Sequence, residues 1–455
     1  MVFSKYLDFI KGKQWNILNL QTGALISLNN ETFKKLKNAV RDGDTSCLSD
    51  NEISMLQEQG FLVSEIDNEI SQEMKPFAYH MAKYNNSQTR LKIDFALTDR
   101  CNFNCPYCFE KDNLCKRGYD NKELFYTGEK VIDYISKLCK KKTIEHVEIV
   151  FYGGEPTLEK DFLKFFINKV SDLESRYGFT FTYLFITNGF LIDTSFISMI
   201  NPKKCRYVQV TIDGTKEFHN QRRTNFAKIN TFDKIIENIC LLLQNGIHVV
   251  IRLNVDKSNF DSVYKFIKEL PSLISTVYYG NLLGVDVARV FGGAESYDLV
   301  EYEKYRMVLI DELNRLGLVS PRTQCKELST FCVAECVTND IVIDHKGLIY
   351  RCWNNVFDDK CKILTIDDLL KNNLNPVESS KITLDYVSKY SLDNVNGGKC
   401  FKCKYVNYCQ GLCPAVRKKI DLGEEKNIYL NGQCKKIIKD RLKQIVMQIE
   451  ERNQC

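Results

Sequence analysis

The feature that most constrains the fold is a regular alternation of apolar runs and amphipathic segments between residues 91 and 290. The runs have the length and β-branched content of strands, and the segments repeat apolar residues at helical spacing. This alternation predicts a parallel sheet with helices outside it, because parallel neighbours need a long crossover connection. The predicted strands are 91–97, 147–152, 182–186, 207–212, 248–254 and 284–290, and the predicted helices are 122–140, 160–176, 231–245 and 259–270.

Polar or glycine-rich loops follow four of these strands. CNFNCPYC, residues 101–108, follows the first strand, and GGEP, residues 153–156, follows the second. Asn188 follows the third strand and Asp213 the fourth. Sites in such folds gather where the carboxyl ends of parallel strands meet, so we expect the four loops to converge on one face.

The chain has 19 cysteines among 455 residues. No apolar run reaches the roughly 18 residues needed to cross a bilayer, and the start lacks the features of a signal peptide, so we expect a cytoplasmic protein without a membrane association. Cysteine clusters in a reducing compartment are more often metal ligands or catalytic groups than disulfides. Four cysteines lie between residues 101 and 115, and ten more lie between 325 and 434.

Three thiolates in a tight loop can bind three irons of a four-iron, four-sulfur cluster and leave the fourth iron open. The pattern Cys101-x3-Cys105-x2-Cys108, with Tyr107 before the last cysteine, resembles the signature of the radical SAM superfamily. The resemblance implies a partial (β/α)6 barrel over residues 90–300. It also implies that the open iron chelates S-adenosylmethionine (SAM), whose reductive cleavage yields a 5′-deoxyadenosyl radical that abstracts hydrogen from the substrate.

Further residues fit the same resemblance as SAM contacts. Gly153, Gly154 and Glu155 match the family's GGEP motif, in which bare backbone lets the ligand approach and the glutamate accepts hydrogen bonds from its ammonium group. The alternative is a strand-to-helix turn with proline at the helix start. Weaker assignments to the ribose and carboxylate, each of which can equally be a cap or a structural hydrogen bond, are Asn188, Thr211, Asp213, Arg222 and Asn254, with Tyr107 beside the cluster.

The cysteine-rich tail resembles the SPASM extension of peptide-modifying radical SAM enzymes, which would make residues 301–455 a bridging region and a SPASM domain. The resemblance implies two auxiliary four-iron clusters, three clusters in all. The outer cluster would take Cys400, Cys403, Cys409 and Cys434, and the inner cluster Cys336, Cys352 and Cys413. Zinc ribbons are the alternative for the Cys400-x2-Cys403 pair.

The fourth ligand of the inner cluster is open. Cys332 is nearest the expected position, Cys325 is an alternative, and Cys361 is a stray. Gly347 lies in a predicted hairpin turn that would return Cys352 towards Cys336. If no protein ligand binds, the inner cluster has an open iron that could take a substrate thiolate.

Residues 1–65 read as a separate module, joined by a polar linker at 66–89. A hairpin over 15–28, a helix capped by Asn30, a second helix after Ser49 and a strand at 61–63 suit a winged helix. This order resembles the recognition domain of enzymes that mature ribosomally made peptides, which bind a leader peptide as an added strand. The module's mixed charges make a poor phosphate-binding face, so we expect no nucleic-acid partner.

The reaction is predicted from the same resemblances. Anaerobic sulfatase maturases typically carry an aspartate as proton acceptor directly after the cysteine that corresponds to Cys352, whereas this chain has Trp353, with Asp344 or Asp358 as conceivable substitutes. The leading hypothesis is a maturase that installs thioether bonds in a cysteine-containing precursor peptide, similar to the sactipeptide and ranthipeptide maturases, with flavodoxin or ferredoxin as electron donor. The alternatives are carbon–carbon crosslinking, epimerisation, sulfatase maturation and a non-catalytic electron carrier. The sequence identifies no catalytic base.

Overall fold

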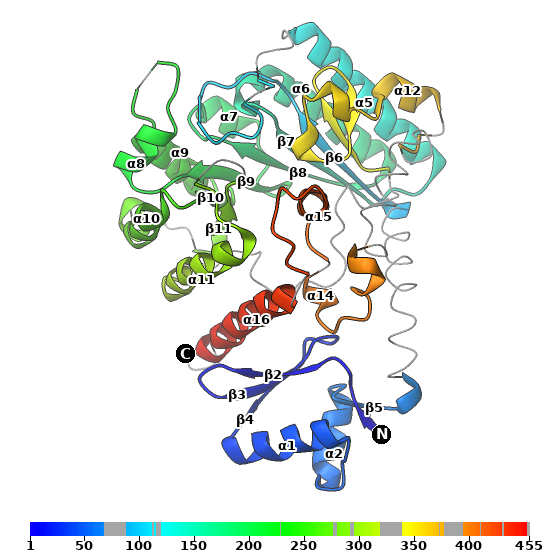
Figure 1. The fold of residues 1–455 in the computed structure, drawn as a ribbon. Helices are drawn as coiled ribbons and strands as arrows, with labels where there is room; N and C mark the ends of the chain where they lie inside the picture. The colour runs from blue at the N-terminus through cyan, green and yellow to red at the C-terminus, as the bar shows by residue number, and fades with distance from the viewer. Residues whose placement is uncertain are drawn as a thin grey trace. The chain divides into compact units, whose positions relative to one another are not determined.

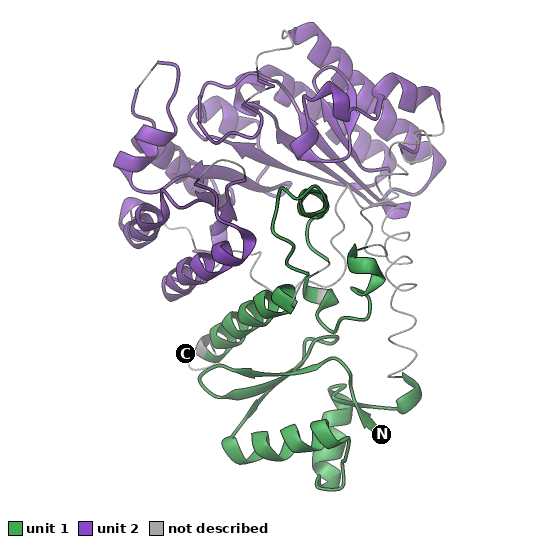
Figure 2. Ribbon diagram, in the orientation of Figure 1, with its two compact units in different colours: residues 1–83, 322–331, 389–455 green, residues 84–321, 332–388 purple. Residues whose placement is uncertain are grey.

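The computed structural model forms two compact units (Figure 2). Unit 1 contains residues 1–83, 322–331 and 389–455, and unit 2 contains residues 84–321 and 332–388. The structure describes residues 1–67, 88–111, 113–114, 120–227, 229–275, 280–291, 295–318, 339–372, 374–376, 395–409, 411–429 and 432–452. Most of the predicted linker at 66–89 therefore lies outside the described residues.

Unit 2 is built on a nine-stranded sheet with the order β11-β10-β9-β8-β7-β6-β12-β13-β14. Its first six strands in the chain are mutually parallel, as the sequence pattern predicted. They are β6 (Arg90–Ala96), β7 (His146–Tyr152), β8 (Thr180–Thr187), β9 (Cys205–Ile212), β10 (Val249–Val255) and β11 (Leu283–Arg289). The predicted α/β fold with a parallel sheet is confirmed.

Helices cover one face of this sheet (Figure 1). They are α5 (Asn121–Lys141), α6 (Lys160–Tyr177), α9 (Phe232–Gln244), α10 (Phe260–Leu273) and α11 (Leu299–Arg315). Their buried stripes pack on alternate strand residues such as Ile93, Phe95 and Phe151. The opposite face, which we call the inner face, carries Ala96 and Tyr152. Side chains alternate between the two faces along a strand. Polar residues on the inner face can therefore build a site without disturbing the core on the other face.

The chain adds three more strands to the sheet after residue 290. Strand β12 (Ile341–Asp344) returns to pair in parallel with the free edge of β6, and β13 (Leu348–Tyr350) and β14 (Leu364–Thr365) extend the sheet in antiparallel fashion. The hairpin around Gly347 is confirmed, with φ of 77° at that residue. The pairing with β6 was missed because a four-residue strand has no detectable period. The short helices α7 (Thr194–Ser198), α8 (Lys216–Arg222) and α12 (Ile366–Lys371) were missed for the same reason.

The N-terminal part of unit 1 holds two small sheets and two helices. Strands β2 (Leu7–Lys11), β3 (Trp15–Asn19) and β4 (Leu25–Leu28) form one antiparallel sheet, and β1 (Val2–Phe3) pairs with β5 (Leu62–Val63). The predicted hairpin is therefore β3–β4, and β1 and β2 were not predicted. Helix α1 (Asn30–Asp42) is capped by Asn29 rather than by Asn30, because the Asn29 side chain accepts from the backbone N–H of Thr32. Ser49 caps α2 (Asp50–Glu58), as predicted.

The C-terminal part of unit 1 packs on the other face of the β2–β3 hairpin. It contains α14 (Val406–Cys409), α15 (Pro414–Asp421) and α16 (Gln433–Arg452). Apolar residues of α16 such as Leu442 and Val446 share a small core with Ile10 and Leu18. The carboxylate of Glu450 accepts hydrogen bonds from the backbone N–H groups of Lys13 (2.7 Å) and Gln14 (3.3 Å) and from the Asn16 amide (2.8 Å). The first and last segments of the chain thus fold as one unit.

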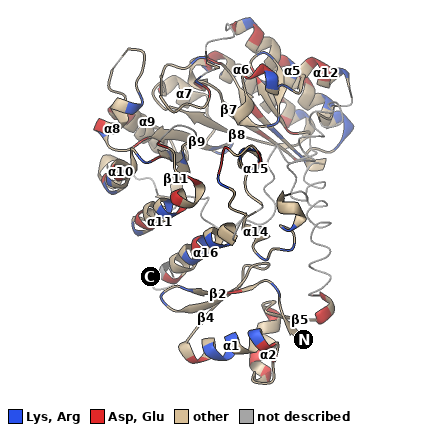
Figure 3. Cartoon of the chain, in the orientation of Figure 1, with Lys and Arg blue, Asp and Glu red and all other residues tan. Residues whose placement is uncertain are grey.

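Charges of both signs are mixed along the described helices (Figure 3). Helix α1 carries the lysines Lys34, Lys35 and Lys37, helix α2 carries acidic residues, and Lys35 forms an ion pair with Glu52 on α2 at 2.7 Å. None of the described helices combines the length and the apolar character that a membrane span requires.

Candidate functional site

The CNFNCPYC loop begins a few residues after β6 and is tied to the loop that follows α8. Phe103 pairs with Asn225 in an isolated β-bridge, and the backbone N–H of Asn104 donates to the carbonyl of Thr224 at 2.8 Å. The thiol of Cys101 interacts electrostatically with those of Cys105 and Cys108, so the three side chains are neighbours. The loop therefore presents three sulfurs together, as the motif predicted.

The three thiols lie mostly inside the protein. Burial raises the pKa of Cys101 and Cys105, and it raises the pKa of Cys108 to about 12. Thiols in this state bind metal with release of their protons, because the thiolate is the ligand. The Cys101 sulfur has two polar groups nearby: the backbone N–H of Phe103 lies 3.4 Å from it, and the Asn188 amide lies 4.0 Å from it.

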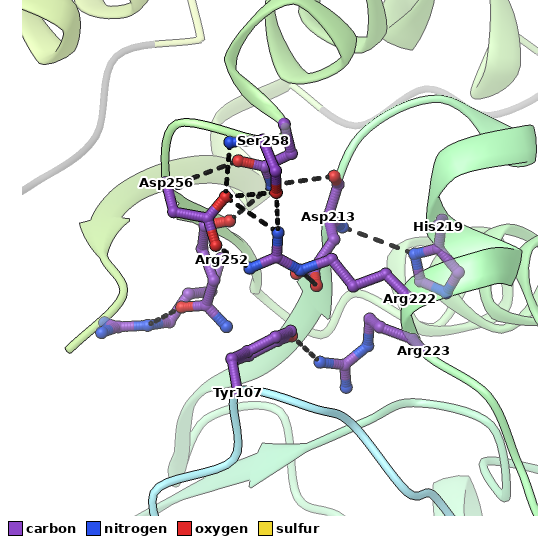
Figure 4. A network of polar contacts seen from close by, with 10 residues as sticks. Tyr107, Asp213, His219, Arg222, Arg223, Arg252, Asp256 and Ser258 are labelled. Atoms are coloured by element: carbon purple, nitrogen blue, oxygen red, sulfur yellow. Dashed lines mark hydrogen bonds and ion pairs between the residues drawn. The ribbon is translucent and has the colours of Figure 1, made fainter. Parts of the chain in front are cut away.

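Tyr107 anchors the loop to strand β9 and helix α8 (Figure 4). Its hydroxyl accepts a hydrogen bond from the Arg223 guanidinium at 2.6 Å, and the Arg222 guanidinium lies 4.4 Å from the centre of its ring. Both arginines are buried. A cation over an aromatic face and a charge-assisted hydrogen bond each favour one orientation of the ring. The aromatic residue before the last cysteine therefore fixes the loop in place.

Arg222 and Asp213, both predicted as SAM contacts, pair with each other (Figure 4). The Nε of Arg222 lies 3.1 Å from the Asp213 carboxylate, and its two terminal nitrogens contact the Asp256 carboxylate at 3.0 and 2.5 Å. His219 accepts from the backbone N–H of Asp213 at 3.4 Å, and burial lowers the pKa of this histidine well below its usual range. Neutral His219 and the ion pairs together hold the end of β9.

The two glycines of GGEP allow a close backbone approach. A Cβ atom on Gly154 would collide with the carbonyl of Arg100, and one on Gly153, whose φ is 113°, would lie 2.8 Å from the carbonyl of Thr98. The backbone N–H of Gly154 donates to that Thr98 carbonyl at 2.8 Å. Both positions therefore require glycine because the loop before Cys101 packs against them, and not only because a ligand approaches them.

Glu155 is buried and joins its own loop to the loop that follows β8. Its Oε1 accepts from the Thr157 backbone N–H (3.0 Å), the Thr157 hydroxyl (2.5 Å) and the Thr187 hydroxyl (2.6 Å). Its Oε2 accepts from the backbone N–H of Asn188 at 2.7 Å. Burial raises the pKa of Glu155, and these donors oppose that effect. The carboxylate thus organises the site in addition to any contact with a ligand.

The remaining predicted SAM contacts differ in whether they touch the cysteine loop. The Asn188 amide donates to the side chain of Asn102 at 2.7 Å, within the cysteine loop. The Asn254 side chain accepts from Arg252 at 3.3 Å, and its carbonyl accepts from the Asn259 amide at 2.8 Å. Thr211 is buried on β9, between strands β8 and β10. Asn188 is therefore the member of this set that lies directly against the cysteine motif.

A second cluster of polar groups lies on the inner face and was not predicted. Asp94 on β6 is fully buried, accepts a hydrogen bond from the Trp353 indole and lies 3.3 Å from the Lys92 ammonium. The Trp353 ring stacks on Tyr152 with centroids 5.1 Å apart. The buried Glu110 also faces this region, and burial raises its pKa to about 8. Asp94 was missed because β6 reads RLKIDFA, in which Asp94 follows Arg90 and Lys92 at alternate positions and resembles a residue of a solvated face.

The two aspartates considered as substitutes for the missing one have structural roles. Asp344 accepts from the Tyr350 hydroxyl at 2.9 Å and from the backbone N–H groups of Lys346 and Leu348. Asp358 caps the short turn that ends at Cys361. The first holds the β12–β13 turn, and the second holds the loop after Cys352.

The outer cysteine set comes together in unit 1. The pKa of Cys400 is raised to about 12 by burial and by the neighbouring thiols of Cys409, Cys403 and Cys434. Cys403 and Cys409 also pack beside the core that α16 shares with the N-terminal hairpin. Four sulfurs separated by up to 34 residues in the sequence are therefore neighbours, which agrees with the predicted grouping.

The inner set is divided. Cys352 belongs to unit 2, the exposed Cys413 belongs to unit 1, and Cys336, Cys332 and Cys325 lie outside the described residues. Among the residues that the structure describes, no three Cys, His, Asp or Glu side chains come close enough to hold a single metal ion. A zinc ion would draw its sulfurs to about 2.3 Å from the metal, whereas a four-iron cluster is larger and holds its thiolates further apart. The thiols of the CNFNCPYC loop and those of the outer cysteine set are therefore suitable ligands for a four-iron cluster.

Comparison with known proteins agrees with this geometry. The model of the Radical SAM superfamily matches residues 95–270. A cysteine-type anaerobic sulfatase-maturating enzyme of Clostridium novyi is 31% identical over 343 residues, which cover 70% of this chain and 85% of that enzyme.

Two solved structures have similar folds. Native anSMEcpe with bound AdoMet and Kp18Cys peptide matches with a TM-score of 0.60 and 22% identity, over 80% of this chain and 100% of that one. Streptococcus suis SuiB bound to precursor peptide SuiA matches with a TM-score of 0.51 and 14% identity, over 92% of this chain and 97% of that one. The chain belongs to the radical SAM superfamily, as a maturase-type enzyme that uses S-adenosylmethionine and a four-iron, four-sulfur cluster.

Proposed function

We propose that this enzyme matures a ribosomally synthesised, cysteine-containing peptide by installing intramolecular thioether crosslinks. The observation that carries the proposal is the composition of unit 1, in which a winged-helix-like module and the outer cysteine set share one apolar core. A module for peptide recognition is thereby joined to a set of electron-transfer ligands. This combination suits an oxidative modification of a bound peptide.

In this proposal Cys101, Cys105 and Cys108 hold the SAM-binding cluster. Their mutual proximity and the open position left by three ligands fit that role. When bound, the cluster supplies the electron for SAM cleavage, and hydrogen abstraction from the substrate follows. Tyr107 fixes the loop, and Asn188 lies close enough to the Cys101 sulfur to contact a ligand at the open position.

The auxiliary ligands follow the sequence groups. Cys400, Cys403, Cys409 and Cys434 would hold the outer cluster, and their shared burial supports this set. Cys336, Cys352 and Cys413 would hold the inner cluster, with Cys332 as the candidate fourth ligand. Three clusters would then provide one site for SAM and a route for the electron that the product loses.

The leader peptide would bind as an added strand on β4. In the three-stranded sheet β2-β3-β4, the β2 side is occupied, because Lys404 donates to the Leu7 carbonyl at 2.9 Å and α16 packs on that strand. Strand β4 is the other edge, and Ser27 on it is exposed. Backbone pairing at such an edge gives affinity without demanding a fixed sequence.

The two similar structures support a peptide substrate for this chain. The anSMEcpe structure contains the Kp18Cys peptide, and the SuiB structure contains the precursor peptide SuiA. The SuiB fold also covers 92% of this chain against 80% for anSMEcpe, a difference about as long as the N-terminal module. The peptide partner is therefore a precursor with a leader, in our proposal, rather than a sulfatase.

Sulfatase maturation is the second candidate, because the Clostridium novyi relative is 31% identical. Against it stands Trp353, whose indole N–H is a donor and cannot accept a proton. The deciding experiment uses the reconstituted enzyme with SAM, a reductant and a cysteine-containing peptide with a leader, chosen by a search of the open reading frames that neighbour the gene. We expect a loss of two hydrogens per crosslink by mass spectrometry, with fragments that link a cysteine sulfur to another residue.

A sulfatase-derived cysteine peptide serves as the comparison substrate. Conversion of its cysteine to formylglycine, with no change in the precursor peptide, would favour the second candidate. SAM cleavage to 5′-deoxyadenosine without modification of either peptide would contradict both.

A further inference from the structure

We propose that Asp94 is the group that accepts the substrate's proton when the crosslink forms. This inference rests on the proposed function and names a residue that the cysteine and GGEP motifs do not include. The argument uses the place of Asp94 in the sheet, its contacts and the proton balance of the reaction.

Strand register places Asp94 on the inner face. Its neighbours Ile93 and Phe95 pack into the core under the helices, so Asp94 points to the opposite side of β6. Across the sheet, its partners are Val150 on β7 and Val342 on β12. A carboxyl group between two valines has lost water from both sides. A buried charge in such a place is costly unless it has a function or a partner.

The contacts of Asp94 favour its ionised form. The Lys92 ammonium lies 3.3 Å from one carboxylate oxygen, and the Trp353 indole donates to the other. Burial raises the pKa of Asp94, whereas Lys92 and Trp353 oppose that shift. A carboxylate whose basicity is increased by burial, with a lysine and an indole beside its two oxygens, is suited to accept a proton.

Asp94 lies near the segment that carries Cys352. Tyr152, which stacks on Trp353, interacts electrostatically with Asp94 and with Cys352. Its buried hydroxyl has no hydrogen-bond partner among the described residues. Cys352 directly precedes Trp353 and is one of the inner-cluster ligands in our proposal. The carboxylate, the unpaired hydroxyl and the cysteine segment therefore meet on the inner face of one unit.

The crosslink requires such an acceptor. Joining a C–H carbon to an S–H sulfur removes two hydrogens from the peptide. The first leaves as a hydrogen atom to the SAM-derived radical and gives 5′-deoxyadenosine. Formation of the C–S bond then releases the thiol proton and one electron, and the electron is accepted by an auxiliary iron–sulfur cluster. Asp94 takes the proton in this balance.

The test compares Asp94→Asn with Trp353→Phe and with Asp172→Asn, an exposed carboxylate on α6 that serves as the matched control. Asparagine keeps an oxygen that can accept from the indole but cannot take the proton. We expect D94N to lower the rate of crosslinking about 100-fold or more, the range typical of a lost general base. Uncoupled SAM cleavage, and the Kd of the precursor peptide measured by anisotropy, should stay within about twofold of wild type.

W353F separates a proton acceptor from a structural tie. W353F keeps the carboxylate and removes only the indole donor. We therefore expect its fold decrease in crosslinking rate to be less than a tenth of the fold decrease in D94N. Equal losses in W353F and D94N, a parallel loss of SAM cleavage in D94N, or crosslinking by D94N at the wild-type rate would each overturn the inference. If wild type itself forms no crosslink, the proposed function fails and not the role of Asp94 alone.

Discussion

A Cβ atom on Gly154 would collide with the carbonyl oxygen of Arg100, at the point where the GGEP loop meets the loop that leads to Cys101. Two segments 54 residues apart in the sequence thus touch backbone to backbone. The contact makes the position of the cysteine loop depend on a residue that carries no functional group.

Gly154→Ala should therefore displace the cysteine loop. We expect SAM cleavage to fall about tenfold or more, with a destabilisation of about 1–3 kcal/mol, because the surrounding backbone must shift to admit the methyl group. The measurements are 5′-deoxyadenosine formation and thermal unfolding. Gly178→Ala is the control for lost stability alone: its φ of 77° strains an alanine, but no atom lies within 4 Å of a Cβ there, so it should lower the unfolding temperature without lowering SAM cleavage. If G154A cleaves SAM like wild type, the loop tolerates the shift and the packing argument is wrong.

The cysteine groups should separate by function. Cys101→Ala should abolish SAM cleavage, because two ligands remain for the SAM-binding cluster. Cys400→Ala should retain cleavage and lose crosslinking, since the outer set lies in unit 1 and SAM binding in unit 2. Iron content and product masses check this, with exposed Cys47→Ala as control. Unchanged crosslinking by C400A would contradict the auxiliary role.

Glu450 should stabilise the first hairpin from the far end of the chain. Glu450→Ala leaves the backbone N–H groups of Lys13 and Gln14 and the buried Asn16 amide without their acceptor. We expect a cost of about 1–3 kcal/mol, seen as roughly tenfold or faster hydrogen exchange at residues 13 and 14. Exposed Glu424→Ala, in the same unit, should leave that exchange unchanged. Slow exchange in E450A would show that the hairpin is stable without this contact.

Leader binding should protect one strand of the sheet. Added leader peptide should slow amide exchange in β4, because a new partner takes its free backbone groups, and exchange in β2 should stay the same. The core peptide without its leader is the control. Protection of β2 in place of β4 would move the recognition site to the opposite edge.

His219 should make unit 2 less stable in mild acid. Burial lowers its pKa below the usual 6.5, so the unfolded chain takes up a proton that the folded protein does not. The free energy of unfolding should then fall as pH drops below about 6.5, by up to about 1.4 kcal/mol per unit for this group. His219→Asn, which can still accept from the Asp213 N–H, should flatten that dependence, whereas exposed His146→Asn should not.

The sequence by itself determined the parallel sheet, the positions of its first six strands along the chain and the grouping of Cys101, Cys105 and Cys108. These features are local: apolar periodicity and short spacings are visible along the chain, and strand ends follow from them. The spacing of Cys400, Cys403 and Cys409 was likewise a local signal. The fold brings Cys434 beside these three cysteines.

Only the tertiary structure decided the contacts between distant segments. It returned β12 to the free edge of β6, which brought Trp353 to Asp94 across more than 250 residues. It paired Arg222 with Asp213 and Asp256, where the sequence suggested SAM contacts for the first two. A strand of four residues has too few side chains to show a period, and a buried aspartate that alternates with apolar residues looks the same in the sequence as an exposed one. Such residues acquire their roles only when folding sets the partners that offset the cost of burying them.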